Sequence, residues 1–555
     1  MESDEAAPMK ALSWKSLGFF FAFFSCGAFA GQFCGTSQFQ KHFWNTKNFG
    51  AAARSASVSS TTCDPEFYYD TSAIMERKTA HFRIYYVLEG PHRTSETWID
   101  SLAGSLEAAW NFHTRKHGTK KPRGANPTWH FQKNGNGNLY PVEVLDISLV
   151  RDNAVLLGGF CTACMGLTFP PETSNPDKTE IIIDNDFLYP DESNPTIEYI
   201  SSSSCRYVQA TLPVTNDLTG KNYSKDYGLA LRTTAVHELY HAIQATYVDF
   251  LEYDSYWFEA SATALEEIAS PNANDYWIYL PAFFKSTGTA FDRIPSNYGL
   301  AVWGLYNLYA WNENFDTRLW ERFSTMPDSS FATVYAKELA ARELDPDSAF
   351  ADFAQRLFFA GDRSSLSDTS LRFTADFSDW PFSPHLKKPT VLPVTLEAPS
   401  IGYYRITQDT FPDLSQFVGK ASVVLYGKNQ KATFYSMDTV SWAGLSPLVA
   451  QSENAVLVLS RLQETSIGAL QTDTLPMRSY PNPWRGETPL CFAGLPSTKR
   501  FLEIRTRAGK LVRRFSYTGT SFCIRNEEIR KLMAPGLYYF RAGAKNKAKP
   551  FLVVY

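Results

Sequence analysis

The sequence has little net charge and no repeat, and each shortage excludes a class of protein. Its 53 Lys and Arg nearly balance 57 Asp and Glu, for a formal charge of −4, whereas a dedicated nucleic-acid binder usually shows a basic stripe. Gly and Pro number only 31 each in 555 residues, too few for a fibrous or disordered chain. No period indicates a solenoid. We therefore expect a folded protein of several domains, with no nucleic-acid partner.

Long apolar runs are missing beyond the N-terminus. The first run, Leu17–Ala30, has 14 residues, too few to span a bilayer, and its small-Phe-small ending fits signal-peptidase cleavage. We expect residues 1–30 to be a signal peptide, with a lipoprotein signal at Cys26 as the alternative. No later stretch reaches 18 uninterrupted apolar residues, so we expect no transmembrane span in the mature chain. The protein is then secreted or held at the cell surface.

Cysteines are few, 8 in all. Cys161 and Cys164 form a CxxC that suggests a redox motif or half of a zinc site, but no second CxxC completes a structural cage. One disulfide plus spare thiols is the simpler interpretation in an exported chain. Cys491 and Cys523, which share a C-terminal segment, are the disulfide candidates.

The order of patterns along the chain predicts an α+β half followed by all-β modules. Residues 31–78 include a small, hydroxylated run and are expected to be a linker or pro-segment, in which Cys34 or Cys63 could cap a metal. Up to about residue 359, strand patterns and helical patterns alternate; strands are expected at 81–87, 140–145 and 180–184, and helices at 98–117, 225–247, 254–267 and 300–311. Short β-rich segments then predict a β-sandwich over residues 366–476 and a second β unit over 477–555.

One motif carries chemistry. His237-Glu238-Leu239-Tyr240-His241 lies in the expected long helix, where residues four apart share a face. Both imidazoles can therefore reach one metal ion, and Glu238 stands beside them to take a proton from the attacking water. Such a pattern would arise by chance about 0.01 times in a chain of this composition. The motif thus favours metal-assisted hydrolysis over a helix with two surface histidines.

A catalytic zinc needs a third protein ligand, which leaves the fourth position for water. Glu259 follows His241 by 18 residues and lies in a second expected helix whose small residues permit close approach, so it is the expected ligand. Glu266 is the rival ligand, or else a hydrogen-bond partner that orients a ligating histidine, and a solvated face is its third interpretation. Tyr298 is the candidate oxyanion donor, although a packing role is favoured for it.

Two other clusters are weaker candidates. Four carboxylates at and after the end of the third expected strand could hold Ca²⁺: Asp184, Asp186, Asp191 and Glu192. They fit no calcium-loop consensus, so an ordinary polar turn is expected. The run Ser201–Ser204 lacks the context of a nucleophile elbow and is expected to be a loop.

The motif and its followers resemble a known family. The HExxH helix, then Trp257-Phe258-Glu259-Ala260, then Tyr298-Gly299, are similar to the secreted bacterial zincins of the gluzincin-like type. The resemblance covers about residues 79–365 and implies a zincin-like metallopeptidase domain, in which the edge strand of a mixed sheet binds an extended peptide above a helical half. It implies Zn²⁺ as the cofactor and protein or peptide substrates. The spacing to Glu259 is slightly shorter than in the best-known gluzincins.

The C-terminal unit, residues 477–555, carries a second resemblance. Tyr480-Pro481-Asn482-Pro483 and Pro535-Gly536-Leu537-Tyr538 are similar to the Ig-like sorting domains, type IX secretion-like, that end many exported bacterial proteins. This likeness implies contact with secretion machinery rather than catalysis. The expected function is therefore that of an exported zinc metallopeptidase, with an endopeptidase expected. The alternative is a catalytically inactive zincin scaffold in a surface adhesin or envelope protein.

Overall fold

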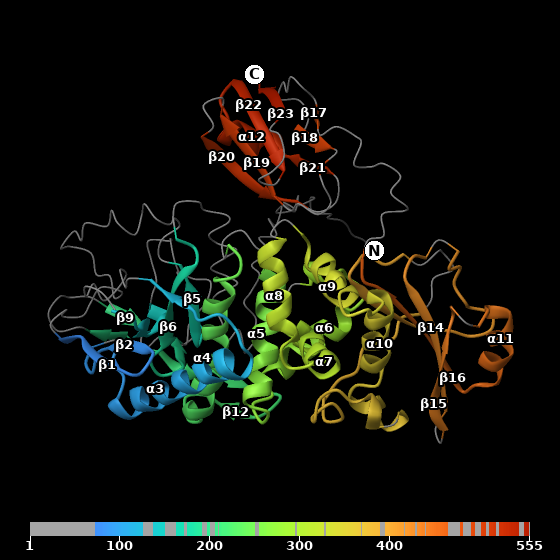
Figure 1. The fold of residues 1–555 in the computed structure, drawn as a ribbon, viewed down its shortest axis with the longest axis horizontal. Helices are drawn as coiled ribbons and strands as arrows, with labels where there is room; N and C mark the ends of the chain where they lie inside the picture. The colour runs from blue at the N-terminus through green and yellow to red at the C-terminus, as the bar shows by residue number, and fades with distance from the viewer. Residues whose placement is uncertain are drawn as a thin grey trace, which may run out of the picture.

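The structure is a computed structural model of a mixed α+β protein, with a central helical region and several small antiparallel sheets toward the C-terminus (Figure 1). It describes residues 73–90, 92–125, 137–149, 163–170, 175–190, 197–199, 206–208, 210–249, 255–294, 297–326, 329–367, 369–388, 395–415, 417–427, 430–438, 440–463, 478–480, 490–493, 495, 501–506, 510–517, 521–542 and 549–553. Several expectations lie outside these residues: the signal peptide, the linker up to residue 72, Cys34, Cys63, Cys161, Asp191, Glu192 and Ser201–Ser204. Among the described residues, no helix combines the length and the apolar character that a membrane crossing would need.

A six-stranded mixed sheet forms the N-terminal part, in the order β1-β2-β4-β6-β3, with β5 also paired to β6. The strands are β1 (Met75–Lys78), β2 (Phe82–Tyr86), β3 (Arg123–Gly124), β4 (Tyr140–Leu145), β5 (Gly166–Phe169) and β6 (Lys178–Asp184). β2, β4 and β6 run parallel, whereas β1 and β5 are antiparallel to their neighbours. Parallel strands are covered on both faces and so read as continuous apolar runs, as β6 does. The three expected strands are present, β1 lies in the segment assigned to the linker, and β3 and β5 are additional.

Two helices lie against this sheet and against each other. α3 (Glu96–Trp110) begins at Ser95, whose side chain accepts a hydrogen bond from the backbone N–H of Trp98 and caps the helix. The expected helix over 98–117 is correct up to Trp110, beyond which the chain widens into a π-helical turn, η3 (Asn111–Lys116). In that turn His113 Nε2 lies 2.8 Å from the carbonyl oxygen of Val236 in α4 (Tyr227–Gln244). The π turn therefore fastens the sheet-covering helix to the helix that carries the HExxH motif.

The central region consists of helices that pack around α4 and its successor, α5 (Ser255–Ala269) (Figure 1). They are α6 (Leu280–Ser286), α7 (Ala301–Trp311), α8 (Phe315–Thr325), α9 (Phe331–Ala340) and α10 (Pro346–Phe358). α7 approaches α5 closely because residue 304 is a glycine, without a side chain at the contact. A Cβ added to Gly304 would lie only 2.7 Å from the Cβ of Ala264. The small residues of α5 thus serve contact with α7 as well as with α4.

A four-stranded antiparallel sheet follows, in the order β13-β16-β14-β15. Its strands are β13 (Ser400–Arg405), β14 (Lys420–Gly427), β15 (Gln430–Ser436) and β16 (Asn454–Arg461). One face belongs to the core of the helical region, where the ring of Tyr403 lies 6.0 Å from that of Phe358 in α10. The other face packs with Leu445 and Val449 of α11 (Trp442–Gln451). Among the described residues of 366–476, helices therefore cover this sheet where the sequence predicted a second sheet.

Two sheets make up the C-terminal module, defined here as residues 478–555. The first joins β17 (Arg478–Tyr480), β18 (Leu490–Ala493) and β21 (Ser521–Ile524), and the second joins β20 (Leu511–Ser516), β19 (Phe501–Thr506), β22 (Gly536–Ala542) and β23 (Lys549–Val553); a short helix is α12 (Asn526–Leu532). Side chains from both sheets fill one core, in which the rings of Phe492 and Phe540 lie 4.8 Å apart. Cys523 is disulfide-bonded and stands opposite Cys491 in the β18–β21 register, as the predicted pairing of the two requires.

Short two-stranded pairs complete the fold before α4. They are β7 (Leu188–Pro190) with β10 (Ala210–Pro213), β8 (Ile197–Tyr199) with β9 (Arg206–Val208), and β11 (Thr215–Asn216) with β12 (Lys221–Asn222).

Candidate metal centre

The HExxH helix is buried almost throughout. Nearly every residue of α4 from Ala230 to Gln244 is shielded from solvent, so this is a core helix. His237 is 4% exposed, and His241 and Glu238 are fully buried. Because burying polar groups without partners costs free energy, each of these side chains needs a specific neighbour.

Three ligand atoms from α4 and α5 converge on one point. The Nε2 atoms of His237 and His241 lie 2.9 Å apart, and the Oε2 atom of Glu259 lies 3.2 Å from the first and 3.5 Å from the second. All three side chains are buried, and together they form a group that could hold a metal ion. The structure thus brings together the two histidines predicted from the helical spacing and the glutamate predicted from the following helix.

The outward nitrogens of both histidines have acceptors that fix the ring tautomers. His237 Nδ1 is hydrogen-bonded to Glu266 Oε1, and a buried carboxylate in this position accepts the hydrogen bond that the ring N–H donates. His241 Nδ1 lies 2.7 Å from Gln244 Oε1. The Gln244 amide is oriented by its own donor nitrogen, which bonds the Phe258 carbonyl at 3.1 Å and Ser261 Oγ at 3.0 Å. Both histidines therefore carry the hydrogen on Nδ1, assigned from this network, and present a lone pair on Nε2.

The donor set fits a divalent cation. Two imidazole lone pairs and a carboxylate within 3.5 Å of one another repel unless a positive charge lies between them. Burial favours a raised pKa for Glu259, but the adjacent His241 and His237 outweigh it and hold that pKa well below its usual range. Two His nitrogens and one carboxylate oxygen are a known zinc set with room for a fourth ligand, and other divalent ions accept similar donors.

Glu266 does not join the ligand group. Its carboxylate contacts the far side of the His237 ring, which is the position that the sequence-based alternative of a histidine-orienting partner requires. Burial raises its pKa, and the neighbouring His237 only partly offsets this effect.

Glu238 faces the sheet beside the metal group. Thr168 Oγ1 in β5 lies 2.7 Å from Glu238 Oε2 and 2.8 Å from the backbone oxygen of Glu238. The approach is close because β5 has a glycine at this point: a Cβ on Gly166 would lie 2.7 Å from Glu238 Cγ. Among the described residues, β5 pairs only with β6, so the strand next to Glu238 lies at the edge of the sheet that those residues form.

Tyr298 lies at the side of the site. Its ring is stacked against His237 with centroids 6.2 Å apart, and against Tyr279 at 4.6 Å. The backbone is held close here, since a Cβ on Gly299 would lie 2.6 Å from Phe283 Cβ. The structure therefore brings Tyr298 to the predicted site, in a packed position, and its role as an oxyanion donor stays a prediction.

A buried carboxylate ties the two ligand-bearing helices to a third. Asp316 of α8 accepts hydrogen bonds from Tyr240 of α4, from Trp257 Nε1 of α5 at 3.0 Å and from Trp320 Nε1 at 3.0 Å. Burial raises the pKa of Asp316 to about 6, against the hydrogen bonds from these three side chains. One buried carboxylate therefore joins α8 to both helices that carry the ligand atoms.

The weaker sequence candidates have structural roles where they are described. Asp184 accepts the backbone N–H groups of Ile147 at 3.0 Å and of Phe187 at 2.6 Å, as expected of a polar turn. Cys164 is buried and disulfide-bonded.

Two positions that sequence reasoning missed are Gln244 and Thr168. Gln244 follows His241 by three residues, so helical spacing could have shown that it shares a face with that histidine. Thr168 lies 70 residues before Glu238 in the sequence, and nothing local to either residue indicates the contact.

Comparisons with known proteins give little. No family model matches the chain, and no curated protein matches it. A solved structure to which the chain is similar is PorZ, described in its title as an essential bacterial surface component of the type-IX secretion system of Porphyromonas gingivalis. The similarity covers 18% of this chain and 14% of that chain, at 20% identity and a TM-score of 0.15. At that score the likeness supports no statement about fold or function.

Proposed function

We propose that residues 79–365 are a zincin-like metallopeptidase domain that hydrolyses peptide bonds with Zn²⁺ held by His237, His241 and Glu259. The observation that carries the proposal is the convergence of the two Nε2 lone pairs and one buried carboxylate. The adjacent Glu238 gives that group a base, which a purely structural metal site does not need.

Each side chain has a role in this chemistry. When bound, zinc would polarise the scissile carbonyl and make a water molecule more acidic. Glu238 accepts the proton of that water and later delivers it to the leaving amine. Thr168 holds the Glu238 carboxylate in place through its hydroxyl. Tyr298 is proposed to donate a hydrogen bond to the oxygen on which negative charge develops.

The edge strand β5 suggests how substrate binds. An extended peptide can add to an exposed strand by backbone hydrogen bonds alone. Along β5 such a peptide would run past Glu238, because Gly166 and Thr168 both contact that side chain. We infer that protein or peptide segments bind there in extended form, which suits an endopeptidase.

The other parts of the chain complete the proposal. Residues 1–30 serve as the signal peptide and 31–78 as a linker or pro-segment. The segment 366–476 supports the helical region, and residues 477–555 form an Ig-like sorting domain that contacts secretion machinery, with Cys491 and Cys523 joined. The protein is then secreted or held at the cell surface.

The test compares the purified mature protein with a Glu238→Gln variant. Both should bind one equivalent of zinc, because Glu238 is not a ligand, while the variant should lose cleavage of a peptide library by about 100-fold or more. A chelator should abolish wild-type cleavage, and zinc should restore it. The proposal fails if the wild-type protein binds no stoichiometric zinc, or if the variant cleaves as well as wild type.

One observation favours a second candidate, the inactive zincin scaffold of an adhesin or envelope protein. His237, His241, Glu238 and Glu259 are between 0% and 4% exposed, and such closure also suits a metal site that only stabilises the fold. Retention of zinc without cleavage of any peptide in the library would assign this second function.

A further inference from the structure

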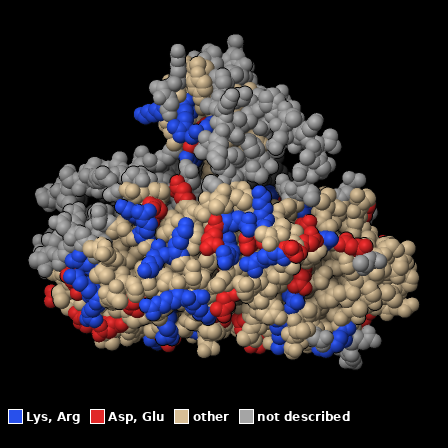
Figure 2. All heavy atoms as spheres, in the orientation of Figure 1, with Lys and Arg blue, Asp and Glu red and all other residues tan. Residues whose placement is uncertain are grey.

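The small net charge of the chain conceals a strong division between its parts. The C-terminal module, residues 478–555, holds 16 Lys and Arg against 4 Asp and Glu, a formal charge of +12. Residues 1–477 hold 37 Lys and Arg against 53 Asp and Glu, a formal charge of −16. The described part of the module shows Lys and Arg side chains on its surface, in blue in Figure 2. Neither the metal group nor the proposed peptidase chemistry uses this charge.

Part of that charge is arranged on one face of the sheet β20-β19-β22-β23. Glu503 of β19 stands opposite Arg514 of β20 and Arg541 of β22 in the strand register. Its carboxylate accepts hydrogen bonds from Arg514 Nη2 at 2.6 Å, from Arg541 Nη2 at 2.8 Å and from Arg505 Nη2 at 2.9 Å. One buried carboxylate thus holds three guanidinium groups on neighbouring strands. We call these four residues, Glu503, Arg505, Arg514 and Arg541, the arginine face.

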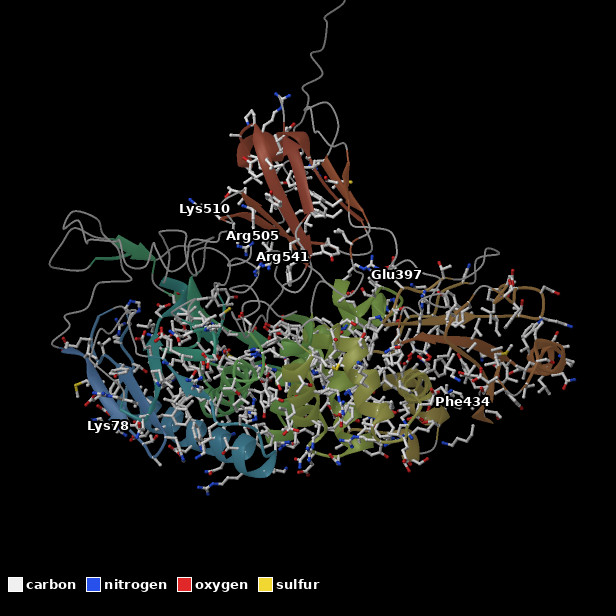
Figure 3. The ribbon with its side chains drawn as sticks, turned by 45° about the horizontal axis from the view of Figure 1, so that its top comes forward. Lys78, Glu397, Phe434, Arg505, Lys510 and Arg541 are labelled. Atoms are coloured by element: carbon white, nitrogen blue, oxygen red, sulfur yellow. The ribbon has the colours of Figure 1, made fainter. Side chains whose placement is uncertain are left out.

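The arginine face remains accessible. The side chains of Arg505, Arg514 and Arg541 are 33%, 20% and 28% exposed, while that of Glu503 is 6% exposed. Figure 3 shows Arg505 and Arg541 side by side on one edge of the module, with Lys510 beyond them. The cluster therefore keeps a surplus of two positive charges at the surface.

Apolar and aromatic side chains adjoin the guanidinium groups. Arg505 pairs with Tyr539 in the register, Leu537 is 38% exposed on the same strand face, and the Arg514 guanidinium lies 5.9 Å from the Phe501 ring. A sheet face that combines arginines, aromatic rings and an exposed leucine has the composition of surfaces that rest at a membrane interface.

We propose that the C-terminal module docks through the arginine face onto an anionic lipid surface and recognises its phosphate headgroups. Guanidinium groups bind phosphate oxygens through paired hydrogen bonds. In addition, each basic residue close to an anionic leaflet contributes to the electrostatic attraction, and these contributions sum over the module. The rest of the chain, at −16, is repelled by the same surface. An extended anionic lipid surface also attracts the basic residues of the whole module, whereas a single bound anion would interact with only a few of them.

The experiment uses the mature chain, from residue 31 onward, because the apolar run Leu17–Ala30 would itself bind lipid. Binding is measured by co-sedimentation with vesicles, either of phosphatidylcholine alone or with added phosphatidylglycerol. We expect binding to the anionic vesicles only, and its loss at high salt because screening shortens the electrostatic range. Lys510→Glu, a change at the exposed residue just before β20, should weaken binding about tenfold. Lys337→Glu, the same charge change on exposed Lys337 of α9, is the matched control and should have no such effect.

A second variant tests the arginine face itself. Arg505→Gln with Arg541→Gln leaves Arg514 to pair with Glu503, and should reduce anionic-vesicle binding by about tenfold or more. Circular dichroism and thermal unfolding would verify that the module of this variant is still folded. Equal binding to both vesicle types, or unchanged binding by Lys510→Glu, would overturn the proposal. So would salt-sensitive self-association without vesicle binding, which would assign the face to the acidic part of a second copy.

Discussion

At the scale of single residues, the candidate metal centre is held by partners of different charge. Glu266, a carboxylate, orients His237, whereas Gln244, a neutral amide, orients His241. The sequence alone predicts His237 and His241 because helical spacing is a local property. It does not predict which way Glu266 faces or that Thr168 meets Glu238, because those contacts join elements whose packing is set by the whole fold.

We expect Gln244→Leu to weaken metal binding without unfolding the protein. The change removes the acceptor for the His241 Nδ1 hydrogen, so the ring is free to turn or to change tautomer. Loss of such a partner typically lowers metal affinity about 10–100-fold. Competition between the protein and a zinc-sensitive chelating dye measures this affinity directly.

Gln355→Leu is the control for that variant. Gln355 lies in α10 and donates a hydrogen bond to Ser422 Oγ at 3.1 Å, far from the metal group in the chain. The Gln355→Leu variant loses a comparable amide hydrogen bond, but one that is not at the metal group. Its zinc affinity should therefore stay at the wild-type value. Equal zinc affinity in Gln244→Leu and wild type would contradict the role given to Gln244.

We expect Gly166→Ala to impair catalysis more than metal binding. The new methyl group would meet Glu238 Cγ at 2.7 Å and Thr234 Cγ2 at 2.8 Å, so the Glu238 carboxylate must move. Misplacement of a base by about 1 Å can cost on the order of 100-fold in rate. The measurement is kcat for peptide cleavage together with zinc content. Gly228→Ala, in the same helix as Glu238 but with open space around its Cβ, should leave both values unchanged.

At the scale of elements, the sequence predicts long segments with a clear apolar period. It does not predict very short strands, nor which elements cover the two faces of a buried strand. The helices α4, α5 and α7 follow their expected ranges closely, because their apolar residues recur at helical spacing. β5 has four residues, and too little pattern to be recognised. In β16 the run Val456–Leu459 correctly indicates a strand buried on both faces, but such a run does not tell whether a sheet or a helix covers each face.

The packing of α4 against α5 yields a prediction about stability. Asp316→Ala would remove the carboxylate that accepts hydrogen bonds from the hydroxyl of Tyr240 and from the indole N–H groups of Trp257 and Trp320 in the core. Each unsatisfied buried donor costs about 1–3 kcal/mol, so we expect the free energy of unfolding to fall by at least about 2 kcal/mol. Urea denaturation followed by tryptophan fluorescence measures the change. A loss below about 0.5 kcal/mol would show that Asp316 does not tie these helices together.

At the scale of the whole molecule, the apolar side chains fall into separate cores. One continuous core runs from the N-terminal sheet through the helices to one face of the sheet β13-β16-β14-β15. The C-terminal module has a core of its own, with no residue in common. Burial is what makes unfolding cooperative, so the module and the larger body should unfold as two units.

We expect two transitions in calorimetry, of which the smaller one depends on Glu503. Burial favours a raised pKa for Glu503, but hydrogen bonds from Arg514, Arg541 and Arg505 outweigh it and lower the pKa to about 2. Because the folded-state pKa lies below the usual value of 4.5, the stabilisation is complete above about pH 4.5 and is lost as the pH falls toward 2. The module's transition should therefore move to lower temperature across that range.

Glu503→Gln separates this effect from the titration of other carboxyl groups. The variant should lower the module's transition at pH 7 and reduce its pH dependence between 4.5 and 2, with the larger transition unmoved. An identical pH profile in wild type and variant would contradict the assignment.

The shared core of the helices and the sheet β13-β16-β14-β15 decides where this protein can be shortened. A chain that stopped at residue 365 would keep every proposed metal ligand, yet it would bare the side of α10 that packs on Tyr403, Val424 and Val458. Such newly exposed apolar surface promotes aggregation. A soluble truncated form that carries the metal group must therefore extend at least to Gln463, beyond β16 and the buried Leu462.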